Sequence, residues 1–147
     1  MVETTGDGDT YQVIWLIRRL FRAFSQKGSE NLQGVGVSVA DRAVMEFLYP
    51  DKKLSVPEIA ERYQVSRQHV QTTVNALLEN GLVVSRDNPR HKRSPLIALS
   101  QKGRKLFASI LKKDEQVITE LFSTIPVNHV QITRRTLQSM LDRLKGE

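Results

Sequence analysis

Neutral hydrogen-bonding side chains cluster on one face of a predicted helix at residues 67–80. The apolar positions recur at helical spacing and mark the opposite, buried face: Val70, Val74, Leu77 and Leu78. At 100° per residue, the outer face and its flanks carry Gln68, His69, Gln71, Thr72 and Asn75. Glutamine and asparagine can form two hydrogen bonds with adenine, and threonine offers a hydroxyl and a methyl group to thymine. Any solvated helix has a polar outer face, but the scarcity of Lys, Glu and Arg in the middle of this one favours the reading of DNA bases.

A basic loop follows this helix between two short apolar runs. The runs, Leu82–Arg86 and Pro95–Leu99, predict the strands of a β-hairpin. Its tip region holds four cations against the single carboxylate of Asp87: Arg86, Arg90, Lys92 and Arg93. A charge run alone is most often a solvated loop. Joined directly to a neutral polar helix, it predicts a surface that attracts the phosphate backbone while the helix reads bases.

Two helices and a tight turn must position this surface. The first helix lies within Leu54–Tyr63, with Pro57 in its first turn, and residues 64–65 form the turn. The second helix, Arg67–Asn80, ends at Gly81. Capping residues stand before both helices: Ser55 with Glu58 at capping-box spacing, and Ser66. Helix, turn, helix and basic hairpin in this order predict a winged helix-turn-helix.

The stretches that carry these signals resemble the multiple-antibiotic-resistance regulator (MarR) family. They are Ser55–Tyr63, Val65–Arg67, Leu77–Val83 and Leu99–Gly103. The resemblance extends over the whole chain and implies an N-terminal helix, a central winged helix-turn-helix and two C-terminal helices that dimerise. Members of the family bind palindromic operators as homodimers. Many release DNA when a small molecule binds between the dimerising and DNA-binding parts.

The family pattern also bears on the wing, which is the basic hairpin. The family commonly carries Asp-x-Arg there, and the arginine enters the minor groove while the aspartate steadies it. Here the triplet is His91-Lys92-Arg93, so Arg93 is kept and a histidine stands in the place of the carboxylate. The helix face, the basic loop and the resemblance together give the expected DNA-binding residues: Ser55, Ser66, Arg67, Gln68, His69, Gln71, Thr72, Asn75, Arg86, Arg90, Lys92 and Arg93.

Composition fits a compact DNA-binding protein. The 147 residues suit one domain, 39% of them are apolar, and the formal net charge of +6 favours a polyanionic partner. The absence of cysteine excludes thiol redox sensing and cysteine-based zinc binding. The chain shows neither a signal sequence nor a long apolar run, so we expect a cytoplasmic protein without a membrane partner.

The remaining segments predict helices that serve assembly. The first runs from Asp9 to about Lys27 with a cap at Asp9-x-x-Gln12, and residues 28–37 form a flexible link. Another helix opens at residues 38–41 and ends by Pro50, and a long one opens at Ser100 and continues until Pro126 breaks it. A last helix follows. Apolar side chains in these terminal helices are the expected dimer interface: Ile14, Ile17, Phe21, Val117, Leu121, Phe122, Leu137, Leu141 and Leu144.

We therefore expect a mostly α fold with a small β-hairpin wing, built as a winged helix-turn-helix plus a helical dimerisation region. Residues 1–147 form a single MarR-like domain, in which residues 38–100 bind DNA and residues 9–27 and 100–145 dimerise. A helical monomer is the alternative to the homodimer.

By the resemblance, a small aromatic or anionic effector binds where the first helix, the second helix and the start of the long helix meet. The expected lining residues are Trp15, Arg18, Phe47 and Tyr49. Each is also explained by an ordinary place in the core or on the surface.

An enzyme is not indicated. The three histidines, His69, His91 and His129, lie far apart in sequence without a neighbouring His or carboxylate at metal-ligand spacing. The chain lacks a glycine-rich phosphate loop and a nucleophile elbow, so we expect no catalytic residues, metal or cofactor. The best interpretation is a sequence-specific transcription regulator, a homodimeric repressor of a pseudo-palindromic operator that responds to a small molecule. The alternative is a winged-helix module that binds RNA or an acidic protein, but such a module would not need an outer helix face of neutral amides.

Overall fold

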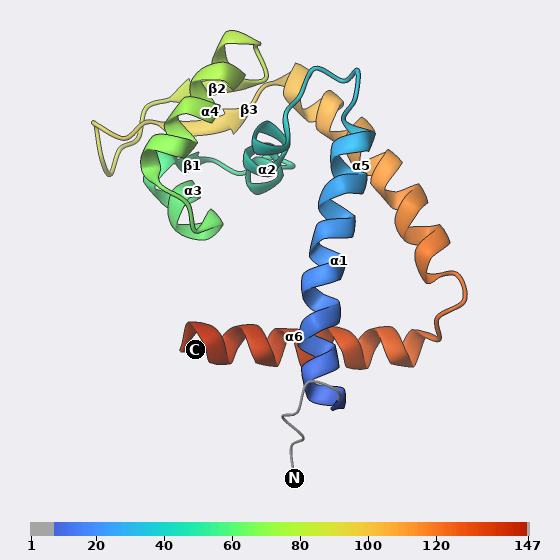
Figure 1. Ribbon diagram of the computed structural model, residues 1–147. Coiled ribbons are helices and arrows are strands. Elements are labelled where there is room, and N and C mark those ends of the chain that lie inside the picture. Colours follow the sequence, from blue (N-terminus) through green and yellow to red (C-terminus); the bar gives the residue numbers. More distant parts are fainter. Residues whose placement is uncertain (1–7, 147) are drawn as a thin grey trace. The chain divides into compact units, whose positions relative to one another are not determined.

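The computed structural model describes residues 8–146 and is mostly helical with one small sheet (Figure 1). Its elements are α1 (Asp9–Asn31), α2 (Val39–Leu48), β1 (Leu54–Ser55), α3 (Val56–Tyr63), α4 (Arg67–Glu79), β2 (Val83–Arg86), β3 (Leu96–Leu99), α5 (Gln101–Phe122) and α6 (Val127–Lys145). The predicted fold class, helical with a β-hairpin wing, is confirmed. The chain divides into two compact units, one ending at Lys113 and the other starting at Asp114.

The sheet has three antiparallel strands in the order β1-β3-β2. Val83 pairs with Leu99 and Arg86 with Leu96, so the predicted hairpin forms with its tip between Arg86 and Leu96. The two-residue strand β1 was not predicted, because a strand this short has no period of its own. It forms where Leu54 pairs with Ile97 of β3, and it ties the start of α3 to the base of the wing.

The core of the first unit lies between α2, α3, α4, the sheet and the first half of α5. Its largest fully buried side chains are Val44, Met45, Leu48, Ile59, Val70, Val74, Leu77, Phe107 and Ile110. The α4 residues in this set match the predicted buried face, whereas Leu78 is exposed. Burial of one face of α4 turns the opposite face to solvent.

Capping side chains begin three of the helices, as predicted. Ser38 and Asp41 form a capping box at α2, Ser55 and Glu58 form one at α3, and the Ser66 hydroxyl accepts the His69 N–H at α4. These bonds satisfy amides that have no partner within the helix. The predicted turn between α3 and α4 forms at a C-cap residue in the left-handed conformation, which is Gln64.

Helix α1 differs from the prediction at both ends. Its N-cap is Gly8, so Asp9 is the first helical residue and not the cap. The helix also continues through Gly28 to Asn31, whereas the link was expected to begin at Gly28. A glycine inside a helix costs only about 1 kcal/mol, which does not end a helix by itself. The turn instead occupies residues 32–36.

The terminal helices leave their apolar side chains outside the core of the chain. Helices α1 and α6 contain no buried residue. Helix α5 ends at Phe122, three residues before the predicted end, and a turn precedes Pro126. No helix among residues 8–146 has the length and apolarity that a membrane crossing needs.

Candidate nucleic-acid interface

The outer face of α4 presents the side chains that the sequence placed there. Gln68, His69, Gln71, Thr72 and Asn75 are all exposed. The Gln71 Nε2 donates to Asn75 Oδ1 at 2.9 Å, and the Thr72 hydroxyl donates to the carbonyl of Gln68 at 3.0 Å. Asn75 therefore has its amide donors free, while Gln71 keeps its acceptor. Because an amide oxygen can accept two hydrogen bonds, Asn75 can pair with adenine through Oδ1 and Nδ2 while Gln71 still donates to it.

The start of α4 is held against α3. The His69 ring packs edge-on against Tyr63 with ring centroids 6.4 Å apart. Thr73 is buried, and its hydroxyl donates to the His69 carbonyl at 3.1 Å. Ser66 and Arg67 remain exposed at the N-terminal end of the helix. His69 thus has a packing role in addition to its place on the outer face.

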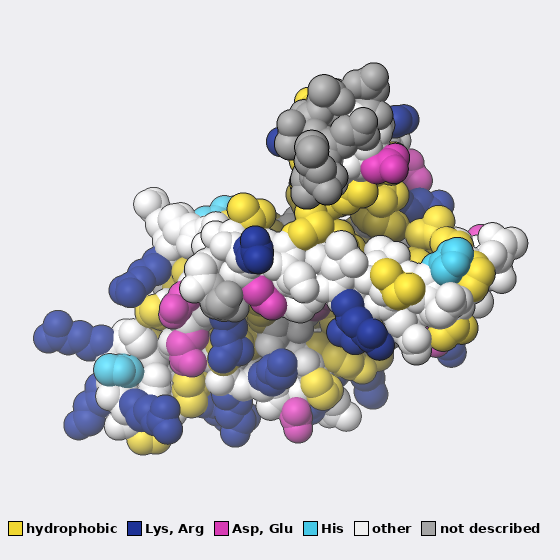
Figure 2. All heavy atoms as spheres, turned by 90° about the horizontal axis from the view of Figure 1, so that it is seen from below, with side chains coloured by type: hydrophobic (Ala, Val, Ile, Leu, Met, Phe, Trp, Pro, Cys, Tyr) yellow, Lys and Arg dark blue, Asp and Glu magenta, His cyan; other side chains and the backbone are white. Residues whose placement is uncertain are grey.

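The wing carries its cations on an exposed loop. Arg86, Arg90, Lys92 and Arg93 are all exposed, and Figure 2 shows dark-blue side chains projecting around the wing. The N–H of Ser94 donates to the carbonyl of His91 at 3.1 Å and closes a turn. Lys92 and Arg93 occupy the two central positions of that turn.

Asn88 is a wing residue that the sequence interpretation missed. It is only 8% exposed, although the residues on either side of it are exposed. Its Nδ2 donates to the Ser94 carbonyl at 2.8 Å, and its Oδ1 accepts the Arg90 N–H at 3.1 Å. The Asn-Pro dipeptide signalled a turn here. Nothing in the local sequence predicted the hydrogen bond from Asn88 across the loop to Ser94.

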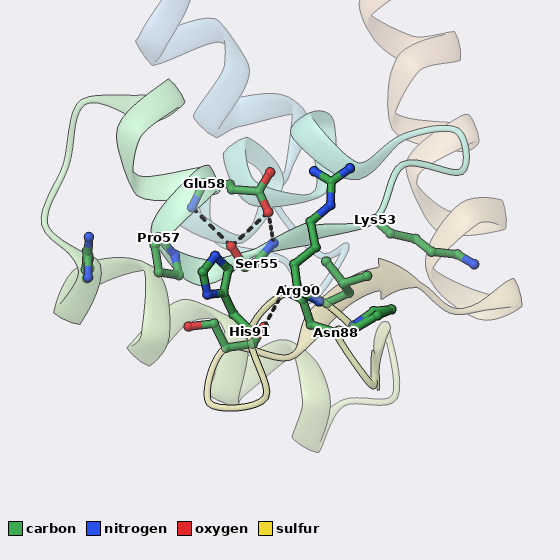
Figure 3. Close-up of a pocket in the computed structure, with 11 residues that line it drawn as sticks. Lys53, Ser55, Pro57, Glu58, Asn88, Arg90 and His91 are labelled. Carbon is green, nitrogen blue, oxygen red and sulfur yellow. Dashed lines mark hydrogen bonds between the residues drawn. The ribbon is translucent and has the colours of Figure 1, made fainter.

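A pocket of about 650 Å³ lies between the wing and the start of α3 (Figure 3). Three cations and one carboxylate line it: Lys53, Arg67, Arg90 and Glu58. Ser55 also lines it, but the residue is 4% exposed and its hydroxyl donates to Glu58 Oε1 at 2.9 Å. The Ser55 side chain is therefore occupied in the cap of α3, and its contact with DNA stays a prediction. Lys53 was not among the expected residues.

Glu58 is held in its anionic form. The Ser55 backbone N–H and hydroxyl both donate to its carboxylate, and these bonds keep the pKa of Glu58 below its ordinary value. Burial raises that pKa slightly, whereas the charges of Arg62 and Arg90 lower it further. The charged carboxylate completes the capping box and balances part of the positive charge in the pocket.

A second pocket, of about 330 Å³, lies between the wing and α4, the expected recognition helix. Arg93 of the wing and Gln68 and Gln71 of α4 line it together with Arg67. The structure thus brings a wing cation and two amide side chains of α4, which are far apart in sequence, to one surface.

The expected effector residues lie in other surroundings. Trp15 and Arg18 are exposed on α1. The Phe47 ring packs against Tyr63 at 5.8 Å, and Tyr49 packs against Phe107 at 5.0 Å between centroids. Neither pocket described above includes any of the four, so the effector site stays a prediction.

The expected dimer residues are largely exposed in this single chain. Ile14, Ile17 and Val117 are half-buried. The others are exposed: Phe21, Leu121, Phe122, Leu137, Leu141 and Leu144. Among residues 8–146, no group of three or more His, Asp or Glu side chains could hold a metal ion.

A helix-turn-helix with a basic hairpin, an exposed polar recognition helix and a shared pocket defines a winged-helix DNA-binding protein. Residues 35–94 match the model of the MarR family. Over 97 residues the chain is 37% identical to an uncharacterized protein of Mycobacterium tuberculosis (strain ATCC 25618 / H37Rv), covering 66% of this chain and 68% of that protein. The chain belongs to the MarR family of transcription regulators.

Solved structures agree over nearly the whole chain. A MarR family transcription regulator is 26% identical with a TM-score of 0.77, covering 93% of this chain and 90% of its own. Staphylococcus aureus MarR in complex with salicylate and kanamycin has a TM-score of 0.85 at 16% identity, with coverage of 94% and 93%. Streptococcus pneumoniae FabT in complex with DNA has a TM-score of 0.79 at 13% identity, with coverage of 94% and 99%. At these last two identities the likeness concerns the fold.

Proposed function

We propose that this protein is a sequence-specific repressor that binds a pseudo-palindromic operator as a homodimer. The observation that carries the proposal is the pocket in which Arg93 of the wing meets Gln68 and Gln71 of α4. A wing cation supplies attraction to phosphates and the minor groove, and neutral amides supply hydrogen bonds to base edges. The combination suits reading of duplex DNA better than a purely electrostatic contact.

The two kinds of contact have separate roles in this proposal. Arg86, Arg90, Lys92 and Arg93 neutralise phosphates and make the affinity depend on salt. The exposed residues of α4 distinguish bases: Arg67, Gln68, His69, Gln71, Thr72 and Asn75, with Ser66 at the helix start. The complex of FabT with DNA supports a DNA-binding role for this fold.

The homodimer is supported by where the apolar surface lies. Among the described residues, the exposed large hydrophobic side chains lie on α1 or after residue 117, with the exceptions of Val39 and Leu78. Burying apolar surface stabilises an assembly by about 25 cal/mol per Å². We assign dimerisation to residues 9–27 and 100–145 and DNA binding to residues 38–100. In the dimer, two recognition helices about 34 Å apart would enter successive major grooves.

A small molecule regulates the dimer in this proposal. The S. aureus MarR complex with salicylate and kanamycin supports ligand binding by this fold. We assign a small aromatic or anionic effector to the region of Trp15, Arg18, Phe47 and Tyr49. It would release DNA by changing the distance or tilt between the two DNA-reading lobes, because a dimer loses both contacts when their spacing is wrong.

A gel shift with the DNA that flanks the protein's own gene tests the proposal, with light scattering of the same sample. We expect a discrete complex of two chains per site that survives competition by scrambled duplex. A monomer at micromolar concentration, bound one chain per site, would refute the homodimer. Tighter binding to RNA or to an acidic protein than to any duplex would refute the operator.

Effector binding is tested by a thermal-shift screen of small aromatic acids, followed by operator titration with each hit. We expect a ligand that raises the melting temperature and weakens operator binding, since it stabilises the state that does not fit DNA. If no such acid alters operator affinity, and the free and bound lobes superpose, regulation by ligand is wrong.

A further inference from the structure

We infer that Asn88 is the positioning residue of the wing, because its side chain holds the backbone of the segment that carries Arg90 and Arg93. The inference rests on the proposed DNA binding for its consequence, but its geometry stands within the wing. Position 91, two residues before Arg93, carries an exposed histidine and no carboxylate. The buried hydrogen-bonding side chain in this loop is instead that of Asn88.

The Asn88 amide joins both ends of the segment that carries the cations. On the near side its Oδ1 accepts the Arg90 N–H at 3.1 Å, and on the far side its Nδ2 donates to the Ser94 carbonyl at 2.8 Å. Ser94 in turn closes the His91–Ser94 turn. Arg90 and the turn that carries Arg93 are thereby tied to one side chain.

Both functions of the amide are needed for this arrangement. Asparagine supplies an acceptor and a donor, whereas aspartate supplies acceptors only. An aspartate at position 88 could still accept the Arg90 N–H, but its oxygen would face the Ser94 carbonyl oxygen. The two bonds are therefore separable by substitution, and the asparagine is the residue type that satisfies both.

The two Asn88 hydrogen bonds matter for binding because a flexible loop has to become ordered when it binds DNA. Immobilising long side chains and a loop on binding reduces affinity, and preordering them removes part of that cost. Asn88 fastens the backbone at Arg90 and at the turn around Arg93 before DNA arrives. Its side chain is buried within the loop, so we expect it to act through the arginines that it positions.

Two measurements on the full-length protein test the inference. The first is amide hydrogen exchange of the free protein. We expect Asn88→Ala to speed exchange of the Arg90 N–H, which loses its acceptor, and of the Ser94 N–H, whose bond to the His91 carbonyl closes the turn that Asn88 holds through the Ser94 carbonyl. We expect Asn88→Asp to speed exchange at Ser94 while Arg90 stays protected. Asn128→Ala, which replaces an exposed asparagine on α6, serves as the control and should leave wing exchange unchanged. Unchanged exchange in both Asn88 variants would overturn the inference.

The second measurement is a double-mutant cycle on operator affinity. We expect Asn88→Ala to weaken operator binding by about tenfold in the wild-type background and by less than about threefold when Arg90 and Arg93 are both already alanine. Equal losses in both backgrounds would mean that Asn88 acts through general stability and would overturn the inference. If the wild-type protein bound no operator, the proposed function would fail, while the exchange pattern would still decide whether Asn88 positions the wing.

Discussion

The substitution Gly103→Ala has two opposite effects on stability: it favours the helix and it creates a steric clash. Gly103 lies at the junction between the winged helix and α5, which we call the joint. Gly103 lies in the first turn of α5, directly beside Leu82. A Cβ there would stand 2.0 Å from the carbonyl oxygen of Leu82 and 3.3 Å from Leu99 Cδ2. Contacts near 2 Å between carbon and oxygen are not sustained, so the backbone of one element must move.

The size of the effect follows from what is able to move. Alanine gains about 1 kcal/mol over glycine as a helix former. Overpacking a tight site costs about 1–3 kcal/mol and occasionally more. The Leu82 carbonyl is fixed, because it accepts the Ser100 N–H at 3.0 Å, and the Ser100 hydroxyl donates to the Gly81 carbonyl at 2.6 Å. Because the clash is with backbone, we expect a cost at the upper end of that range, about 3 kcal/mol, which leaves a net loss of about 2 kcal/mol in unfolding free energy and a melting temperature lower by about 4–8 °C.

The assay is urea unfolding of both proteins at the same protomer concentration, since a dimer's stability depends on concentration. Gly28→Ala is the matched control. Gly28 also lies inside a helix, but outside the helix's own backbone its added Cβ would meet nothing nearer than Arg42 Nη1, at 4.0 Å. We expect this control to gain up to about 1 kcal/mol. A Gly103→Ala protein as stable as wild type would refute the expectation that a Cβ at position 103 clashes with the Leu82 carbonyl.

Four further substitutions test the interface, the cap and the dimer. Arg93→Ala should weaken binding to operator and scrambled DNA by a similar factor and lower the log–log salt slope by about one. Gln68→Ala should cost about 1–3 kcal/mol of binding free energy on the operator and little on scrambled DNA. Equal losses on both DNAs would mean that α4 contacts only the phosphate backbone of the DNA. The pKa of Glu58 is lowered from 4.5, so its charge contributes stability above that pH which is lost as the pH falls through the folded pKa. Glu58→Gln should therefore differ most from wild type near neutral pH in thermal melts, and a gap that is constant into acid would contradict the cap's charge effect. Leu141→Glu, at a side chain 46% exposed in the single chain, should give a monomer by light scattering; a variant that stays dimeric would place α6 outside the interface.

The recognition helix was predictable because its signals are local. Ser66 caps it, and the 3.6-residue period places Val70 and Val74 in the core and Gln68 outside, as the structure has them. Leu78 follows the same period but lies at the margin of the buried face and is exposed. Periodicity predicts the direction of a side chain. It does not predict how far the neighbouring elements extend over it.

The wing and the joint were only partly predictable because their decisive contacts are not local. A loop rich in turn residues was evident, but the burial of Asn88 depends on Ser94 across the loop. The strand β1 depends on β3, and the need for glycine at position 103 depends on the Leu82 carbonyl. In each case the residue type permits the contact, while a distant segment creates it.

The joint also bears on how a change elsewhere would reach the recognition helix. The C-terminal end of α4 is fastened to the start of α5, since Ser100 bonds the Gly81 carbonyl at 2.6 Å and Lys102 Nζ donates to the Asn80 carbonyl at 3.0 Å. On the other side, α2 follows α1 through a turn at residues 32–36. A reorientation of the start of α5 must therefore carry the end of α4 with it or break these bonds, whereas the turn contacts the core through apolar side chains such as Leu32. We expect regulation to travel through α5, because the start of this helix is hydrogen-bonded to the C-terminal end of α4.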